Sequence, residues 1–533
     1  MKLKKALLLT LPAMLLGGCF SFNTDMIEEE TGPKDIDDSS LVIVPDESVS
    51  GTLNIRFYKR GFGDSFLQQA KYAFQKKYPK VAVEISSSTE AKVVYAETIG
   101  GVETKYDLYI SEASIMDYTD KFVNINDVFS STVEGENVTI ENKVEKFYLD
   151  SCKDGRGDYY TLPAYCGAYG IVYNRDFISE NQIPKTSDEL VALCSTLKSQ
   201  SITPFVYSGG DSSIYLNFLY STWAAQYEGQ EQYLMAQKGR VWDQANNRYK
   251  TDVSSAYLTG YLKSMKALED IFWVTKMNSS TQCVGYNANA AQEKLLDASN
   301  TTAMMWNGSW IMNEMATMIK GYDVDINDFG MMKAPVLSAI REKCASIEND
   351  AELSALVSAI DKKDTSLTGD GYDVTQADYD RVAEARSFVY AGSEGSRMVI
   401  TKKAQHQDLA KLFMKFYYTN ACIAYFNESN SGCFVPAVNT TIDLSKKNKF
   451  YKDVYSILTE KTKFFNVLAA FQAVTPSIVP DGKGTIEQAL GSPNSEDRAT
   501  AQEMFDWKKT TWTANNNQKF KDEMGKKGYQ LDD

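Results

Sequence analysis

Two hydrophobic periods alternate along the body of the chain. Apolar residues occupy every second position over 53–57, which predicts a strand with one buried face. A glycine-containing loop at 59–64 comes next, and apolar residues then recur at helical spacing over 66–78. A second alternating segment follows at 81–85. This order of strand, helix and strand predicts two parallel strands joined by a crossover helix.

The same alternation continues far along the chain. Thr186 and Glu189 have the spacing of a helix-capping box, which predicts the start of a helix. Further strands are predicted at 106–110, 170–174 and 202–207, and further helices at 187–197, 214–227 and 258–270. Strands and helices that alternate over this length predict an α/β fold with sheets covered by helices on both faces.

Length and composition narrow the functional class. The chain has 533 residues, whereas single cores stop growing at roughly 250–300 residues, so we expect at least two domains. Acidic residues outnumber basic ones by 70 to 56, which argues against nucleic acid as a partner. The single histidine, His406, argues against His-based metal sites and Ser-His-Asp catalysis. We therefore predict no catalytic residue, no metal and no cofactor.

The N-terminus has the pattern of an export signal. Three lysines stand among the first five residues, and the apolar run that follows at 6–16 is too short to span a bilayer as a helix. Leu16-Gly17-Gly18-Cys19 resembles the bacterial lipobox, in which cleavage precedes the cysteine and its thiol receives a diacylglycerol. We predict a lipoprotein signal peptide over 1–18, and a lipidated Cys19 with an acidic tether over 19–51. The alternative is an apolar N-terminal segment with a cysteine by chance.

Residues 338–386 differ from their surroundings. A charged segment with a helical pattern leads into a polar stretch that contains several aspartates. Asp370-Gly371-Tyr372-Asp373 lacks the spacing of a twelve-residue EF-hand loop, so a solvated acidic loop is favoured over a calcium site. We predict that 338–386 is an insertion made of a helix and an exposed loop.

Six short motifs follow one another along the chain. They are Phe74-Gln75-Lys76-Lys77-Tyr78-Pro79-Lys80-Val81, Tyr106-Asp107-Leu108, Tyr173-Asn174-Arg175-Asp176, Pro184-Lys185-Thr186-Ser187-Asp188-Glu189-Leu190, Thr302-Ala303-Met304-Met305-Trp306-Asn307-Gly308-Ser309-Trp310 and Tyr390-Ala391-Gly392-Ser393-Glu394-Gly395. Together they resemble family 1 of the extracellular solute-binding proteins, the sugar-binding lipoproteins and periplasmic receptors of ABC importers that include maltose-binding protein. The resemblance covers about 52–335 and 387–515, and Ser187 departs from it because a tryptophan is usual there.

The resemblance implies a two-lobed periplasmic-binding-protein fold of the class II type. Each lobe would be a doubly wound α/β sheet, with the ligand cleft between the lobes. We expect lobe 1 to consist of 52–152 plus 284–333, and lobe 2 of 153–283 plus 387–533.

The resemblance also implies a function. The chain would be a lipid-anchored receptor on the outer face of the bacterial cytoplasmic membrane. It would bind a carbohydrate, expected to be an oligosaccharide, and deliver it to the permease subunits of an ABC importer. The expected partners are this small-molecule ligand, the permease and the lipid bilayer reached through Cys19. A monomer without enzymatic activity is expected.

A sugar site needs flat aromatic rings for the C–H faces of the ligand and planar polar groups for its hydroxyls. The segment from Trp306 to Trp310 supplies both, and the family pattern places a stacking ring at Trp310. Ligands in open α/β sheets bind beyond the carboxyl ends of strands, which adds candidates from both lobes. The predicted ligand-binding residues are Arg60, Asp64, Glu112, Tyr165, Tyr169, Asp211, Tyr215, Trp306, Asn307, Trp310, Ser393 and Glu394. For the tryptophans the alternative is a place in the core, and for the others an exposed loop.

Two other functional classes stay open at this point. A secreted carbohydrate-active enzyme needs a pair of carboxylates, and 70 acidic residues supply such pairs by chance. A receptor for another solute, such as a peptide or a polyamine, would suit acidic residues such as Asp64, Glu112, Asp211 and Glu394.

Overall fold

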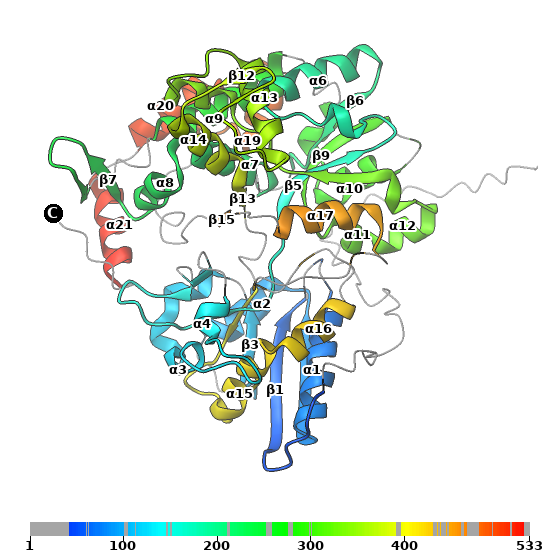
Figure 1. Cartoon of the computed structure of the whole chain (residues 1–533), viewed down its shortest axis with the longest axis vertical. Helices are drawn as coiled ribbons and strands as arrows, with labels where there is room; N and C mark the ends of the chain where they lie inside the picture. The colour runs from blue at the N-terminus through cyan, green and yellow to red at the C-terminus, as the bar shows by residue number, and fades with distance from the viewer. Residues whose placement is uncertain are drawn as a thin grey trace, which may run out of the picture.

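Two separate mixed β-sheets, each packed with helices, divide the chain into two lobes (Figure 1). The computed structural model describes residues 42–526, except for 60, 62, 101–104, 112, 145–147, 150–151, 211–213, 252–257, 275–280, 298, 300, 391–395, 430–433, 435–436, 439–443, 445–446, 460–462, 466–478, 493 and 512–513. The predicted signal peptide, Cys19 and most of the tether lie outside the described residues. The two-lobed α/β fold class predicted from the sequence is confirmed.

Lobe 1 is built on a five-stranded sheet with the order β2-β1-β3-β14-β4. Its strands are β1 (Ser50–Tyr58), β2 (Lys80–Ser88), β3 (Leu108–Ser111), β4 (Leu162–Pro163) and β14 (Arg397–Val399). The first three strands are parallel, as the strand–helix–strand pattern predicted, whereas β14 runs antiparallel to β3 and β4. Its helices are α1 (Ser65–Lys77), α2 (Ala91–Ile99), α3 (Asn126–Phe129), α4 (Ile140–Lys143), α15 (Gln407–Tyr417) and α16 (Asn420–Ser429).

Alternation in the strands of lobe 1 gives the sheet two buried faces. Leu108 and Ile110 of β3 join the large core to which α1 contributes. Tyr109, between them, packs with Val94 of α2 and Val399 of β14 in a separate cluster. Because successive side chains of a strand point to opposite faces, helices cover both sides of this sheet.

Lobe 2 is built on a four-stranded sheet with the order β10-β5-β9-β6. Its strands are β5 (Tyr169–Asn174), β6 (Thr203–Val206), β9 (Thr302–Gly308) and β10 (Phe329–Met332). Smaller pairs join β7 (Arg240–Asp243) to β8 (Arg248–Thr251), and β13 (Phe388–Tyr390) to β15 (Lys463–Phe465). Its helices are α6 (Ser187–Ser199), α7 (Ile214–Glu228), α8 (Gln230–Gln237), α9 (Thr259–Glu269), α10 (Ala288–Leu296), α11 (Ile311–Glu314), α12 (Ala316–Tyr322), α17 (Lys449–Thr459), α19 (Ile486–Gly491), α20 (Ala501–Thr511) and α21 (Ala514–Lys526). Among the described residues, no helix is both long enough and apolar enough to span a membrane.

The division of the chain between the lobes differs from the expected one. We expected 284–333 in lobe 1, but β9 and β10 pair with β5 and so belong to the sheet of lobe 2. We expected all of 387–533 in lobe 2, but β14 pairs with β3, and α15 and α16 pack against α1 (Figure 1). The reason is that periodicity predicts a strand but not its partner, which is set by contacts far apart in sequence.

The segment predicted as an insertion, 338–386, has a hydrophobic core of its own. Leu353, Leu356 and Val382 are buried in a cluster separate from the main core, together with Val336, which directly precedes the segment. The segment contains α13 (Asp350–Asp361), the hairpin strands β11 (Thr368–Gly369) and β12 (Tyr372–Asp373), and α14 (Gln376–Ser387). Residues 361–371 are largely exposed, as expected, but the polar stretch contains the β11–β12 hairpin and a second helix, in which Tyr372 and Tyr379 are buried. That the segment is an insertion relative to the family stays a prediction.

Asp361 ties this small core to its surroundings. Arg386 donates to both of its carboxylate oxygens, at 2.8 and 3.0 Å, and Lys185 of lobe 2 donates at 2.9 Å. Burial by itself raises the pKa of Asp361, but the two cations outweigh it and lower the pKa to about 2. The carboxylate therefore stabilises the fold above the ordinary aspartate pKa, and this contribution is lost as the pH falls from about 4 to about 2.

We predict that Asp361→Asn lowers the free energy of unfolding by about 1–2 kcal/mol at pH 7, after allowance for partial exposure of the pair. The difference from the parent protein should shrink as the pH falls toward about 3, because Asp361 then becomes protonated in the unfolded chain. Urea unfolding of both proteins at several pH values measures this difference in the free energy of unfolding. Asp370→Asn, which removes the same charge from an exposed position, is the matched control. Equal stability of the two variants at pH 7 would contradict the prediction.

Candidate functional site

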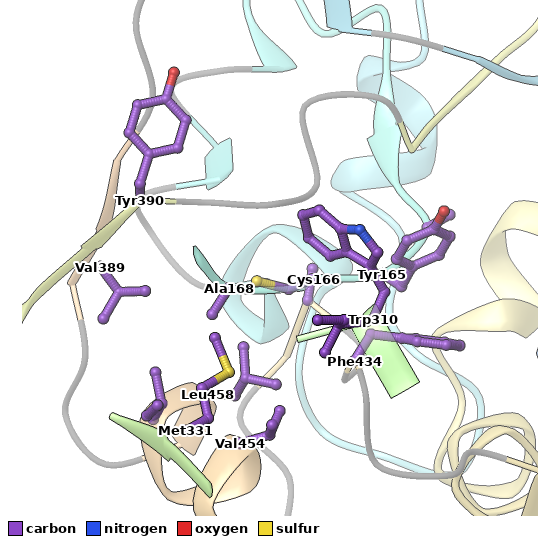
Figure 2. Close-up of a cluster of buried hydrophobic side chains, with 14 of the residues drawn as sticks. Tyr165, Cys166, Ala168, Trp310, Met331, Val389, Tyr390, Phe434, Val454 and Leu458 are labelled. Carbon is purple, nitrogen blue, oxygen red and sulfur yellow. The ribbon is translucent and has the colours of Figure 1, made fainter. Parts of the chain in front are cut away.

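Aromatic rings surround the segment 164–168, where the chain passes from the sheet of lobe 1 to the sheet of lobe 2. Tyr165 is buried there, with its ring against Phe66 of α1 at 5.0 Å and against Phe434 at 4.8 Å between centroids. Figure 2 shows Tyr165 and Phe434 in the buried cluster that also holds Trp310 and Tyr390. Tyr165, predicted to bind ligand, is therefore placed within the packing of the crossing segment.

Four rings from four segments of lobe 2 form an arrangement that we call the aromatic wall: Tyr169 of β5, Phe218 of α7, Trp310 and Tyr390 of β13. Tyr169 stacks on Phe218 at 3.5 Å and meets Trp310 edge to face at 4.8 Å. Tyr390 lies 4.5 Å from Phe218 and 5.8 Å from Tyr169. The structure thus brings together two predicted site residues, Tyr169 and Trp310, and adds two rings that the sequence did not single out.

Trp310 stands at the start of α11, directly after β9, and Gly308 gives it room. A Cβ atom on Gly308 would lie 2.2 Å from the six-membered ring of Trp310. The indole therefore folds back over the end of its own strand, which only a residue without a side chain permits. The close approach at Gly308 is therefore made by the Trp310 ring.

A loop of lobe 1 touches lobe 2 beside Trp310. The side chain of Asn313 donates to the carbonyl oxygen of Gly61 at 2.6 Å. A Cβ on Gly61 would lie 3.0 Å from Cδ1 of Trp310 and 3.0 Å from Cβ of Glu314. In the same loop, the carboxylate of Asp64 pairs with the Lys59 ammonium at 2.9 Å. The predicted site residue Asp64 therefore lies in the loop that faces the Trp310 region, with its charge balanced by its neighbour.

Glu314 is a polar group of this region that sequence reasoning missed. It is one helical turn after Trp310, and its side chain is exposed. The buried amide of Gln292 donates to its Oε2 at 2.7 Å. The surrounding protein raises the pKa of Glu314, and the Gln292 hydrogen bond opposes that change only in part. Within the described part of the chain, no cation pairs with this carboxylate. The sequence signal that could have identified Glu314 is its place four residues after Trp310, a predicted ligand-binding residue.

Two predicted site residues are placed away from the aromatic wall. Trp306 stacks on Phe205 at 5.1 Å, lies edge to face with Trp223, and is 5% exposed. Asn307 is 1% exposed, and its side-chain oxygen accepts from the backbone N–H of Gly308 at 2.7 Å. Both side chains are packed in the core, which for Trp306 is the alternative that the sequence left open, and their ligand-binding roles stay predictions. All seven residues of β9 are buried, so every side chain of that strand is used in packing.

The remaining predicted residues lie outside the part of the chain whose side chains the structure describes. Arg60, Glu112, Asp211, Ser393 and Glu394 lie outside the described residues. Tyr215 is part of α7, but its side chain lies outside the description. Their ligand-binding roles stay predictions. No group of three or more potential metal ligands is found among the residues that the structure describes.

The fold and the aromatic wall define a two-lobed α/β protein of the solute-binding class. The model of the bacterial extracellular solute-binding protein family matches residues 61–421, which is more than half of the chain. The chain therefore belongs to this family, as the sequence motifs predicted. No curated protein sequence matches the chain.

Solved structures with the same fold include several sugar receptors. The GacH receptor of Streptomyces glaucescens, solved unliganded and with acarbose, is 14% identical, with a TM-score of 0.53 over 90% of this chain and 99% of that chain. A chitin oligosaccharide binding protein is 17% identical, with a TM-score of 0.54 over 86% of this chain and 98% of that chain. Maltose-bound MalE3 of T. maritima is 14% identical, with a TM-score of 0.52 over 86% of this chain and 98% of that chain. At these identities the likeness shows a shared fold.

We predict that Gly308→Ala displaces the Trp310 indole and lowers the free energy of unfolding by about 1–3 kcal/mol, the usual range for overpacking. Thermal unfolding and the near-UV circular dichroism of the aromatic residues measure the two effects. Gly321→Ala is the matched control, because a Cβ there meets no atom within 4 Å. A Gly308→Ala protein with the stability and spectrum of the parent would refute the close packing described here.

Proposed function

We propose that the protein is a receptor that binds a carbohydrate between its lobes, at the aromatic wall, and passes it to an ABC importer. The observation that carries the proposal is the placement of Tyr169 and Trp310 next to polar groups of both lobes. Rings of this kind cover the C–H faces of a sugar, while carboxylate and amide groups bind its hydroxyls. Glu314, Asn313 and the loop that contains Asp64 supply such groups within one region.

The comparisons support the class of ligand. Three receptors with the same fold are described with acarbose, chitin oligosaccharides or maltose as their ligands. Membership of an extracellular family supports a location outside the cytoplasm. We propose a chain anchored by lipid at Cys19 to the outer face of the cytoplasmic membrane, without enzymatic activity or cofactor, and active as a monomer with its permease.

Isothermal titration of the soluble mature domain against a sugar panel tests this proposal. The panel contains galactose, maltose, raffinose, acarbose, and oligosaccharides from chitin and xylan. We expect saturable binding of one class of sugar, and we expect that sugar to be recovered chemically unchanged after the titration. Binding of a peptide or of spermidine alone would identify a receptor for another solute. Accumulation of shortened sugars during long incubation would identify an enzyme.

We predict that Trp310→Ala weakens binding of the sugar found in this panel by about 10- to 100-fold, the range for loss of an aromatic anchor. Trp242→Ala is the matched control, because Trp242 is 45% exposed in the β7–β8 hairpin, outside the aromatic wall. Titration of both variants, each checked for folding by circular dichroism, gives the comparison. Equal affinities for the parent and a folded Trp310→Ala protein would remove Trp310 from the site.

Lipid anchoring makes a separate prediction. Expressed with its native N-terminus in a bacterial host, the chain should fractionate with membranes, and Cys19→Ser should release it into the soluble extracytoplasmic fraction. Intact mass spectrometry should show a lipid mass on Cys19 of the parent only. Cys344→Ser, outside the signal, controls for loss of a cysteine as such. A membrane-bound Cys19→Ser protein would show that another feature holds the chain.

A further inference from the structure

We infer that Glu314, held by Gln292, is a binding group that selects for hydrogen-bond donors on the ligand. This inference rests on the proposed function and adds to it a specific contact. The donors are hydroxyl groups of a neutral sugar or the ammonium of an amino sugar, and the experiment below distinguishes the two sources. Neither Glu314 nor Gln292 was among the residues predicted from the sequence.

The geometry places the carboxyl group at the edge of the Trp310 ring. One point, the position of a Cβ on Gly61, lies 3.0 Å from Cδ1 of Trp310 and 3.1 Å from the carboxyl carbon of Glu314. The edge of the indole and the carboxyl group therefore both lie close to Gly61, side by side where the loop of lobe 1 meets α11. A sugar ring on the indole would have its hydroxyl edge within reach of the carboxylate, as stacking with lateral hydrogen bonds requires.

The hydrogen bonds leave this carboxylate able to accept more. Gln292 donates to Oε2 alone, and within the described part of the chain Oε1 of Glu314 accepts no hydrogen bond and has no cation beside it. Gln292 itself is fully buried, and its side-chain oxygen has no partner among the described residues. Its amide therefore fixes one carboxylate oxygen, while the Glu314 residue as a whole is exposed.

The charge balance explains why a ligand donor would stabilise this arrangement. Although the side chain of Glu314 reaches solvent, the surrounding protein raises its pKa, and among the described residues no cation pairs with the carboxylate. The nearby Lys59 is already paired with Asp64. A hydroxyl or ammonium group of the ligand would supply the missing partner, and hydrogen bonds to charged groups are among the strongest in proteins.

The experiment compares Glu314→Gln with the control Glu293→Gln, which removes an exposed carboxylate from α10. Isothermal titration uses the tightest-binding sugar of the panel described above, its deoxy analogues, and the oligomer of glucosamine. We expect Glu314→Gln to weaken binding by about tenfold or more and Glu293→Gln to leave it unchanged. One deoxy analogue should bind the parent and Glu314→Gln alike, because it lacks the hydroxyl that Glu314 contacts.

The glucosamine arm separates the two donors. A larger loss for the glucosamine oligomer than for the neutral sugar identifies the ammonium as the donor, and an equal loss identifies a hydroxyl. Gln292 is expected to act only by positioning Glu314. Gln292→Met alone should therefore weaken sugar binding, whereas adding Gln292→Met to Glu314→Gln should weaken it no further. Full additivity of the two substitutions would refute the positioning role.

Failure of this inference is distinct from failure of the proposed function. If Glu314→Gln binds sugar like the parent while Trp310→Ala does not, the inference is wrong and the receptor function stands. If the parent binds no sugar of the panel, the proposed function is wrong, and this inference is overturned with it.

Discussion

The two lobes share one hydrophobic core, and its continuity depends on the rings that enclose the crossing segment 164–168. Phe66, Tyr165 and Phe434 pack edge to face, while the hydroxyls of Tyr417 and Tyr418 donate to the carbonyls of Ala164 and Pro163 at 2.6 Å. These two hydrogen bonds attach the start of the crossing segment to lobe 1. Ala164 is bound by Tyr417, the last residue of α15, and Pro163 is bound by Tyr418, which directly follows that helix. The chain up to Tyr165 is therefore held against lobe 1.

The aromatic wall begins where that fixed segment ends. Tyr169 is the first residue of β5, four positions after Tyr165, and it contacts Phe218, Trp310 and Tyr390. The rings of the crossing and the rings of the wall are thus successive parts of one arrangement. A change in the angle between the lobes would alter how the loop containing Gly61 meets Trp310, because Asn313 joins the two across the lobes.

Local structure was predictable from the sequence, and the larger arrangement was not. The helix predicted to start after Thr186 is α6, where the Thr186 hydroxyl accepts from the Glu189 backbone N–H at 3.2 Å. Glu189 instead accepts from the backbone N–H of Lys185, so only half of the capping box forms. The motif segment that forms β9 was not predicted as a strand and was expected in lobe 1, because its run of apolar residues says nothing about which sheet it joins. Contacts between distant segments carry that information.

In the candidate site, too, the sequence predicted a local feature but not the contacts between distant segments. The motif around Trp310 identified a ring that does belong to the aromatic wall, whereas Trp306, four residues earlier, packs on Phe205 in the core. Sequence alone does not separate these two tryptophans, since both belong to one short motif, and only the folded chain shows that Trp306 lies within β9 whereas Trp310 follows the strand and folds back over Gly308. Phe218 and Tyr390 were missed because they come from a helix and a short strand that only the folded chain brings to Tyr169.

The exchange of segments between the lobes has a consequence for how the chain folds during synthesis. The sheet of lobe 1 pairs Ile110 with Met398, so β14, its last strand along the chain, emerges only after the whole sheet β10-β5-β9-β6 of lobe 2. Such a pairing joins residues far apart in sequence, and long-range pairings of this kind slow folding. The N-terminal part of lobe 1 therefore remains without its neighbour while most of the chain is made. A protein that leaves the cell as an extended chain would gain from this delay, because the exporting machinery meets it before the first lobe can close.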